Sequence, residues 1–195
     1  MSDNTFNYNY LFPSLVVYKD FGEVSEDLVE LSRNILTEHG EKPFNSPCLS
    51  TVHTYPNVLN LSEFADIKEQ IVQTISVFSD IHKIKKDDMY FVDSWLNSYE
   101  QHGYQDLHLH ADALLSGVYY IKSKGEKDFV FQSPWHFYQP ITPKYEETNL
   151  NNCHTADYNS NSGRCIIFMS HLMHRTLPAT EERISLSFNI KYKNV

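Results

Sequence analysis

The pattern of hydrophobic and polar positions changes near the middle of the chain. In the first half, apolar residues recur every three to four positions in two stretches, which predicts helices over about 25–38 and 62–82. From residue 89 onward the apolar segments become short, and the last one, 183–192, alternates apolar and polar residues. We therefore expect two supporting helices followed by a β-rich body.

The β-rich part is interrupted by one segment without a clear period, residues 133–162. It contains three prolines and an Asn-rich run, which predicts a lid that partly packs on the domain or a disordered insert. Lys124-Gly125-Glu126 indicates a hairpin turn. Many short strands after two helices indicate an α+β, mainly β domain with a sandwich or barrel as its body. The predicted strands are 89–99, 105–110, 114–122, 128–132, 164–169 and 183–192.

Composition limits the number of domains and the class of partner. A chain of 195 residues, 41% of them hydrophobic, suits one domain over 1–195, with 1–88 as helical support and 89–195 as the β-rich core. A formal net charge of −9 argues against general nucleic-acid binding. The three cysteines form no disulfide framework, and the sequence shows no signal peptide or membrane span. These features favour a cytoplasmic protein.

Histidines form a pattern that is typical of a metal site. On a strand, His108, His110 and Asp112 would share one face, and His174 would bring an imidazole from a distant part of the chain. Such convergence suits the facial site of non-haem Fe(II). His110 and Asp112 have the HxD form of a two-histidine-one-carboxylate triad, whereas His108 and His110 would give an all-nitrogen triad. Both alternatives use His110 and His174, and the residues alone leave the choice open.

The polar face of the last segment is a second candidate site. Arg183 and Ser185 share this face, and a guanidinium can hold a carboxylate through two hydrogen bonds while a hydroxyl adds a third. Arg183 follows His174 by nine positions, so the returning strand could place the guanidinium one layer deeper than the metal. That arrangement would hold the far carboxylate of a five-carbon keto diacid that chelates the iron. The two sites together favour an iron enzyme with a keto-acid co-substrate.

Motifs within residues 89–192 carry a resemblance to a known family. In order and spacing, the chain resembles the 2-oxoglutarate/Fe(II)-dependent oxygenase superfamily, and it is most similar to a small branch found in bacteria and tailed phages. The motifs are Trp95-Leu96-Asn97, His108-Leu109-His110, Ser116-Gly117-Val118-Tyr119-Tyr120, Phe129-Val130-Phe131 with Pro134, Gly163-Arg164-Cys165-Ile166-Ile167-Phe168, Ser170 with His174, and Arg183-Ile184-Ser185-Leu186-Ser187-Phe188-Asn189.

The resemblance implies a fold, an activity and a set of cofactors. The fold is a double-stranded β-helix, or jelly roll. The activity is that of a dioxygenase that uses Fe(II), 2-oxoglutarate and O2, releases succinate and CO2, and commonly hydroxylates its substrate. The location implied is the cytoplasm of a bacterial or phage-infected cell.

The resemblance also implies roles for particular residues. His108 opens the metal motif and His174 is the distal ligand, while Arg183 and Ser185 bind the far carboxylate of 2-oxoglutarate. The superfamily usually has HxD where this chain has His108-Leu109-His110, so we favour His108, His110 and His174, with Asp112 as the alternative third ligand.

Two residues of the next predicted strand are further candidates for the co-substrate site. Ser116 and Tyr119 could contact the co-substrate, with ordinary core packing as the alternative for Tyr119.

Two other functional classes share these features. A jelly-roll fold also serves non-catalytic structural or binding modules, and three histidines can form a zinc or cupin-like enzyme. Arg183-Ile184-Ser185 argues against the zinc alternative, because zinc hydrolysis does not need this anion site. The sequence does not identify the substrate, which could be a small molecule, a peptide or a protein residue. It is compatible with a homodimer through an edge strand of the N-terminal half.

Overall fold

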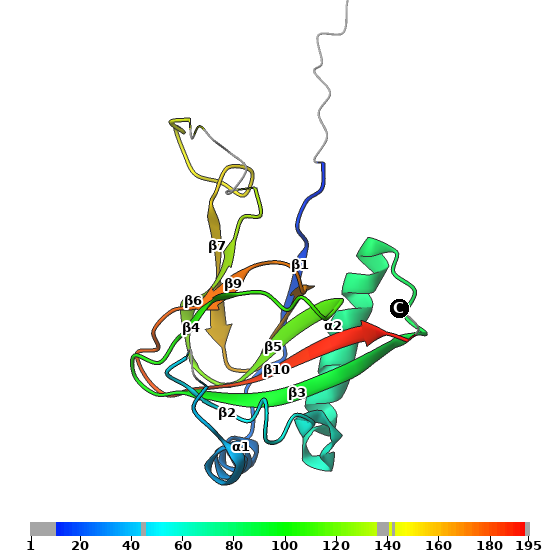
Figure 1. The fold of residues 1–195 in the computed structure, drawn as a ribbon, viewed down its shortest axis with the longest axis vertical. Coiled ribbons are helices and arrows are strands. Elements are labelled where there is room, and N and C mark those ends of the chain that lie inside the picture. Colours follow the sequence, from blue (N-terminus) through cyan, green and yellow to red (C-terminus); the bar gives the residue numbers. More distant parts are fainter. Residues whose placement is uncertain (1–10, 44–45, 136–140, 142, 194–195) are drawn as a thin grey trace, which may run out of the picture.

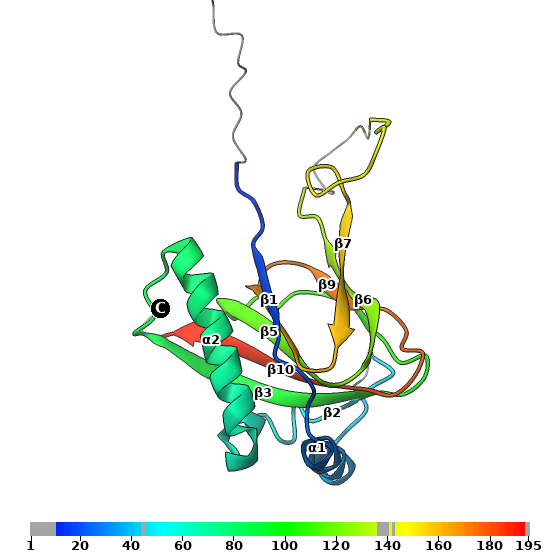
Figure 2. The same ribbon diagram turned by 180° about the vertical axis from the view of Figure 1, so that it is seen from behind.

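The computed structural model of the chain describes residues 11–43, 46–135, 141 and 143–193. Two antiparallel sheets lie face to face, and two helices, α1 (Glu26–His39) and α2 (Ala65–His82), cover the outer side of the larger sheet (Figures 1 and 2). This architecture is the mainly β jelly roll with supporting helices that the sequence predicted. In the described part of the chain, no helix combines the length and apolar character required to span a bilayer.

The larger sheet has six strands and the smaller one has four, and all neighbouring strands are antiparallel. In spatial order, the larger sheet contains β1 (Val16–Asp20), β8 (Arg164–Met169), β5 (Leu115–Lys122), β10 (Arg183–Tyr192), β3 (Met89–Tyr99) and β2 (Leu49–Ser50). The smaller sheet contains β4 (Gln105–His108), β9 (His174–Thr176), β6 (Lys124–Gln132) and β7 (Thr155–Asn161).

Helix α1 begins with the side-chain cap that its local sequence predicts, whereas α2 begins without one. The Ser25 hydroxyl caps α1 by accepting a hydrogen bond from the Leu28 N–H at 3.4 Å, and acidic residues follow in the first turn. Two short 3₁₀ turns, η1 (Val58–Asn60) and η2 (Ser62–Phe64), precede α2. Helix α2 ends at His82, and the capping residue Lys83 adopts the left-handed region with φ of 57°. The predicted ranges 25–38 and 62–82 are therefore close to the observed helices.

Apolar side chains fill two layers on the two faces of the larger sheet. Between this sheet and the helices, Leu96, Leu186 and Phe188 are fully buried. Between the two sheets, Phe129 and Phe168 pack with their rings 5.9 Å apart. The second layer fills only part of the space between the sheets, and a cavity lies in the rest.

The structure corrects the prediction that 133–162 is one insert without regular structure. Its last part forms β7, which pairs with β6 through partners such as Phe131 and Ala156. The residues of β7 are mostly polar, so a search for apolar runs does not find this strand. It forms a strand because it pairs with β6, which lies elsewhere in the sequence. The preceding loop projects from the body of the domain (Figure 1), although residues 136–140 and 142 of the predicted lid lie outside the described residues.

The predicted hairpin turn at Lys124-Gly125-Glu126 is also wrong. Strands β5 and β6 belong to different sheets, so the chain crosses between sheets at Ser123. Gly125 lies within β6 with a φ of +85°, where the register of the β6–β7 pair shifts. A glycine in this conformation is typical of a β-bulge, which explains why the sequence looked like a turn.

Candidate active site

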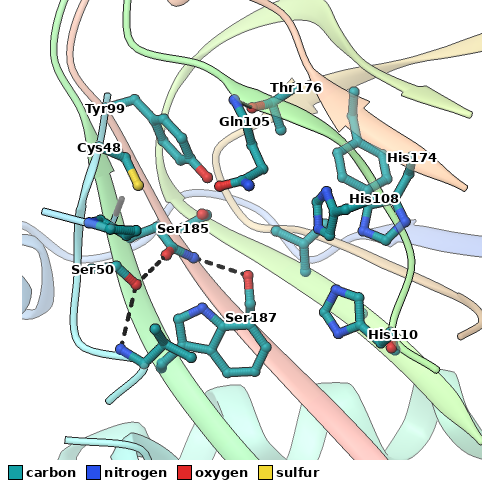
Figure 3. Close-up of a pocket in the computed structure, with 18 of the residues that line it drawn as sticks. Cys48, Ser50, Tyr99, Gln105, His108, His110, His174, Thr176, Ser185 and Ser187 are labelled. Atoms are coloured by element: carbon teal, nitrogen blue, oxygen red, sulfur yellow. Dashed lines mark hydrogen bonds between the residues drawn. The ribbon is translucent and has the colours of Figure 1, made fainter. Parts of the chain in front are cut away.

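A cavity of about 250 Å³ lies between the two sheets. Three imidazoles gather at one end, and the hydroxyls of Tyr99, Ser185 and Ser187 face it at the other (Figure 3). The walls come from both sheets, so the strands that build the fold also build the site.

The imidazoles of His108, His110 and His174 form one cluster. Their rings have centroids 5.2 Å apart for His108 and His110, 4.3 Å apart for His108 and His174, and 5.3 Å apart for His110 and His174. One ring nitrogen of each residue lies within 4.8 Å of the corresponding nitrogens of the other two. His108 and His174 are paired partners on β4 and β9, whereas His110 follows the end of β4. A segment near residue 110 and one near 174 thus meet at one point.

Each of the three Nδ1 atoms has an oxygen acceptor. His108 Nδ1 lies 2.7 Å from the Asp106 carbonyl, and His174 Nδ1 lies 2.9 Å from the Leu172 carbonyl. Since a carbonyl oxygen can only accept, Nδ1 of both histidines carries the proton. His110 Nδ1 lies 2.8 Å from the side-chain oxygen of Asn189, which has the same consequence. The Nε2 atoms therefore keep their lone pairs and are the three available metal ligands.

Burial keeps these imidazoles neutral. It lowers the pKa of His108 and His110, and it lowers the pKa of His174 to about 3. The neutral form is the one that coordinates a metal ion, so the cluster is ready to bind without losing protons.

The alternative ligand Asp112 does not join this cluster. It lies in the turn after His110, its side chain is 97% exposed, and it forms an ion pair with Lys191. The prediction that His110 and Asp112 share a strand face fails, because β4 ends at His108. Within the described ranges, no carboxylate or thiol completes a larger ligand group around the three histidines.

A buried hydrogen-bonded network supports His110. Ser116 donates a hydrogen bond to the Asn189 side-chain oxygen at 2.7 Å, and its hydroxyl lies 2.8 Å from that of Ser170. Ser116 lines the cavity, as a residue that contacts the co-substrate would. Its hydrogen-bond partners, Asn189 and Ser170, belong to the network behind His110. The role of Asn189 was missed, although its position on the polar face of 183–192 was a signal.

Of the two adjacent tyrosines of β5, the structure brings Tyr120 to the cavity and not Tyr119. Tyr119 points to the opposite face of the sheet, where its hydroxyl donates to Gln70 of α2 at 2.6 Å. Tyr120 lines the cavity, and its buried hydroxyl has no hydrogen-bond partner among the described residues. Successive side chains of a strand face opposite ways, so the choice between neighbours depends on which face the smaller sheet covers.

Ser185 and Arg183 lie at the end of the cavity that is farther from the histidines. Ser185 lines the cavity directly, whereas Arg183 is 2% exposed and lies behind Tyr99, with its guanidinium carbon 4.4 Å from the ring centroid. Arg183 also forms a buried ion pair with Asp128 of β6. Sequence reasoning missed Asp128, although an acidic residue next to Phe129-Val130-Phe131 is an unusual feature for a core strand.

Comparisons with known proteins agree with this geometry. Residues 93–189 match the protein family described as "Putative 2OG-Fe(II) oxygenase". Among curated proteins, none matches the chain by sequence. Solved structures with a similar fold include a prolyl-4-hydroxylase from Pseudomonas putida, with 12% identity and a TM-score of 0.63 over 91% of this chain and 93% of that one.

Two further solved structures are similar. HygX from Streptomyces hygroscopicus, with nickel and 2-oxoglutarate bound, has 11% identity and a TM-score of 0.62 over 93% of this chain and 84% of that one. The viral collagen prolyl hydroxylase of Paramecium Bursaria Chlorella virus-1, in complex with 2-oxoglutarate, has 15% identity and a TM-score of 0.52 over 91% of this chain and 96% of that one.

Fold and site together define a jelly-roll protein with a preformed cluster of three histidines that could hold a metal ion. The family match assigns residues 93–189, the β-rich half of the chain, to the putative 2OG-Fe(II) oxygenases.

Proposed function

We propose that the protein is a dioxygenase that binds Fe(II) through the Nε2 atoms of His108, His110 and His174 and hydroxylates a substrate. The observation that carries this proposal is the fixed orientation of the three rings. Each Nδ1 is hydrogen-bonded to an oxygen acceptor, and the candidate ligand atoms lie within 4.8 Å of one another. A histidine that only fills a core has no reason to meet two others in this way.

The donor set fits a non-haem iron site. Imidazole suits Fe(II), and His108, His110 and His174 would hold the ion while leaving room for the co-substrate and O2. When bound, the iron and 2-oxoglutarate supply the oxidative chemistry, in which O2 and 2-oxoglutarate give succinate and CO2 and one oxygen atom goes to the substrate. The remaining tasks of this chain are to orient the substrate and the co-substrate, to bind the far carboxylate of 2-oxoglutarate and to exclude water.

We assign the far carboxylate of 2-oxoglutarate to the end of the cavity that is opposite the histidines. Ser185 and Tyr120 offer hydroxyl groups there, and the Tyr120 hydroxyl has no other partner in the described part of the chain. Arg183 lies next to them with its Nε atom buried and similarly unpartnered. A buried guanidinium with a free N–H is a strong carboxylate donor. Ser116 lies at the histidine end, where its hydroxyl donates to Asn189 behind His110.

Apolar side chains keep water from the space between the two ends. Trp95, Val118, Phe129 and Phe168 line the cavity between the polar groups. An apolar lining that excludes water strengthens the electrostatic interactions within the site and protects reactive species from hydrolysis. The substrate class stays open between small molecules and peptides, since the similar structures include a prolyl-4-hydroxylase and HygX with hygromycin B bound.

The test is turnover of 2-oxoglutarate by the purified protein. We expect succinate formation that depends on Fe(II), together with the visible charge-transfer absorption of an Fe(II)-bound 2-oxo acid under anaerobic conditions. His174→Ala should abolish both. His171→Ala is the matched control, because His171 is exposed and lies three positions away. A wild-type protein that binds neither Fe(II) nor 2-oxoglutarate would contradict the proposal.

A further inference from the structure

The guanidinium assigned to the co-substrate already holds a carboxylate of this chain. Asp128 and Arg183 face each other across the two sheets, with side-chain exposures of 5% and 2%. Their ion pair joins Asp128 Oδ2 to Arg183 Nη1, while Asp128 Oδ1 and Arg183 Nε have no hydrogen-bond partner among the described residues. The pair is therefore electrically neutral but incompletely satisfied.

Adding a dianionic co-substrate to this pair creates a charge problem. At this end of the cavity, one guanidinium would then face two carboxylates in a buried space, while the metal ion and the near carboxylate of the co-substrate would lie at the histidine end. An uncompensated buried charge is costly, and such a site usually responds by taking up a proton. Two carboxylates that share one site likewise do not both stay ionised.

In the described part of the chain, Arg183 is the cation that pairs with Asp128. The groups that face Asp128 are Arg183 from β10, Tyr120 from β5, Tyr99 from β3, Ser160 from β7 and Glu126 from its own strand. Among these groups, Arg183 is the cation that pairs with Asp128, Arg164 acts on the neighbouring Tyr120, and Glu126 adds a further negative charge. The free Oδ1 atom of Asp128 is available to carry a proton.

We propose, on the basis of the function proposed above, that Asp128 is a positioning residue for Arg183 that takes up one proton when the far carboxylate of 2-oxoglutarate binds. The proton comes from solvent and is held on Oδ1. Asp128 thereby makes the affinity for a dianionic co-substrate dependent on pH, whereas a keto acid without the far carboxylate binds without this proton.

The environment of Asp128 favours this role. Burial raises the pKa of the Asp128 carboxyl above its usual range, against the opposing effect of the Arg183 guanidinium. A second carboxylate on the same guanidinium raises it further.

Calorimetry of the Ni(II)-loaded protein measures this proton directly, because Ni(II) allows binding without turnover. Binding heats in two buffers with different ionisation enthalpies give the number of protons taken up. The matched ligand is 2-oxopentanoate, which has the same chain length as 2-oxoglutarate and a methyl group in place of the far carboxylate. At about pH 7.5, we expect wild type to take up about one proton more with 2-oxoglutarate than with 2-oxopentanoate.

The matched variants separate this role from a purely structural one. In Asp128→Asn, the difference between the two ligands should vanish, and 2-oxoglutarate should bind more tightly. Wild type should lose about tenfold in affinity for each pH unit at the alkaline end of the range, and the variant should not. Asp157→Asn, which removes an exposed carboxylate from β7, should behave like wild type.

Two results would overturn the proposal, and a third would reject the function on which it rests. The first is equal proton uptake with both ligands in wild type, a comparison that needs no variant and so holds even if Asp128→Asn fails to fold. The second is an unchanged excess of proton uptake in folded Asp128→Asn. The third, the absence of 2-oxoglutarate binding to Ni(II)-loaded wild type, would instead reject the proposed function on which this inference rests.

Discussion

The side-chain oxygen of Asn189 lies 2.8 Å from Nδ1 of His110, although 79 positions separate the two residues. The same oxygen accepts a hydrogen bond from Ser116 at 2.7 Å. A residue of the last strand therefore fixes the ring of a candidate metal ligand that follows β4. Partners of this kind orient the ring and set the tautomer, so they contribute to metal affinity without touching the metal.

Loss of the Asn189 side chain should weaken metal binding. We expect Asn189→Ala to lower the affinity for Fe(II) or Ni(II) by about 10- to 100-fold, because the His110 ring loses its fixed orientation. Competition with a chromogenic chelator measures this affinity. Asn60→Ala, at an exposed position, is the control. An unchanged affinity in folded Asn189→Ala would show that the network behind His110 does not orient it.

Metal binding should quench the fluorescence of Trp95. Its ring is stacked on His110 with the centroids 6.0 Å apart, whereas the only other tryptophan, Trp135, is 55% exposed. In Trp135→Phe, titration with Ni(II) should therefore quench the remaining emission. Adding His174→Ala to this variant should remove the effect. If Ni(II) quenches the emission of wild type but not that of Trp135→Phe, the metal ion binds away from Trp95.

The ion pairs between Glu182 and its two partners should stabilise the protein. Arg33 of α1 binds both oxygens of this carboxylate, at 3.1 and 2.8 Å, and Lys122 lies 2.9 Å from one of them. These hydrogen bonds lower the pKa of Glu182 from 4.5 to about 2, and the bond with Arg33 has the largest effect. After allowance for its partial exposure, we expect Glu182→Gln to lower the free energy of unfolding by about 1 kcal/mol at neutral pH.

The pH dependence of this effect has a definite sign. Because the pKa is lower in the folded state, the stabilisation is present above the unfolded value of 4.5 and is lost as the pH falls towards 2. Chemical denaturation of wild type and Glu182→Gln should therefore give curves that converge in this acidic window. Glu181→Gln is the control, since Glu181 is exposed and pairs only with Lys124 among the described residues. A constant difference at all pH values would contradict the assignment.

Gly117 should tolerate no side chain. A Cβ at this position would lie 2.3 Å from Cζ of Phe188 and 2.8 Å from the Ile166 carbonyl oxygen. We expect Gly117→Ala to lower the free energy of unfolding by about 1–3 kcal/mol, as overpacking in cores does. Thermal unfolding measures this, and Phe188→Leu combined with Gly117→Ala should recover part of the loss relative to the sum of the single variants. A neutral Gly117→Ala would mean that the sheet adjusts freely.

The two helices and most strands could be predicted because their signals are local. An apolar stripe with a cap, as at Ser25, specifies an amphipathic helix whatever surrounds it. The alternation in 183–192 also separated a core face from a polar face, and Ser185 and Ser187 of that polar face do line the cavity. Strand β7 could not be predicted in this way, because its polar residues are held by hydrogen bonds to β6, which lies elsewhere in the sequence.

The sequence by itself determined the class of fold, the family and the histidines that could bind a metal, since residue type and spacing carry that information. Only the tertiary structure decided which of them meet. It turned Asp112 to solvent, placed Tyr120 in the cavity in place of Tyr119, and paired Arg183 with Asp128. The physical reason is that strand ends, sheet faces and buried ion pairs depend on contacts between distant segments, which no local pattern encodes.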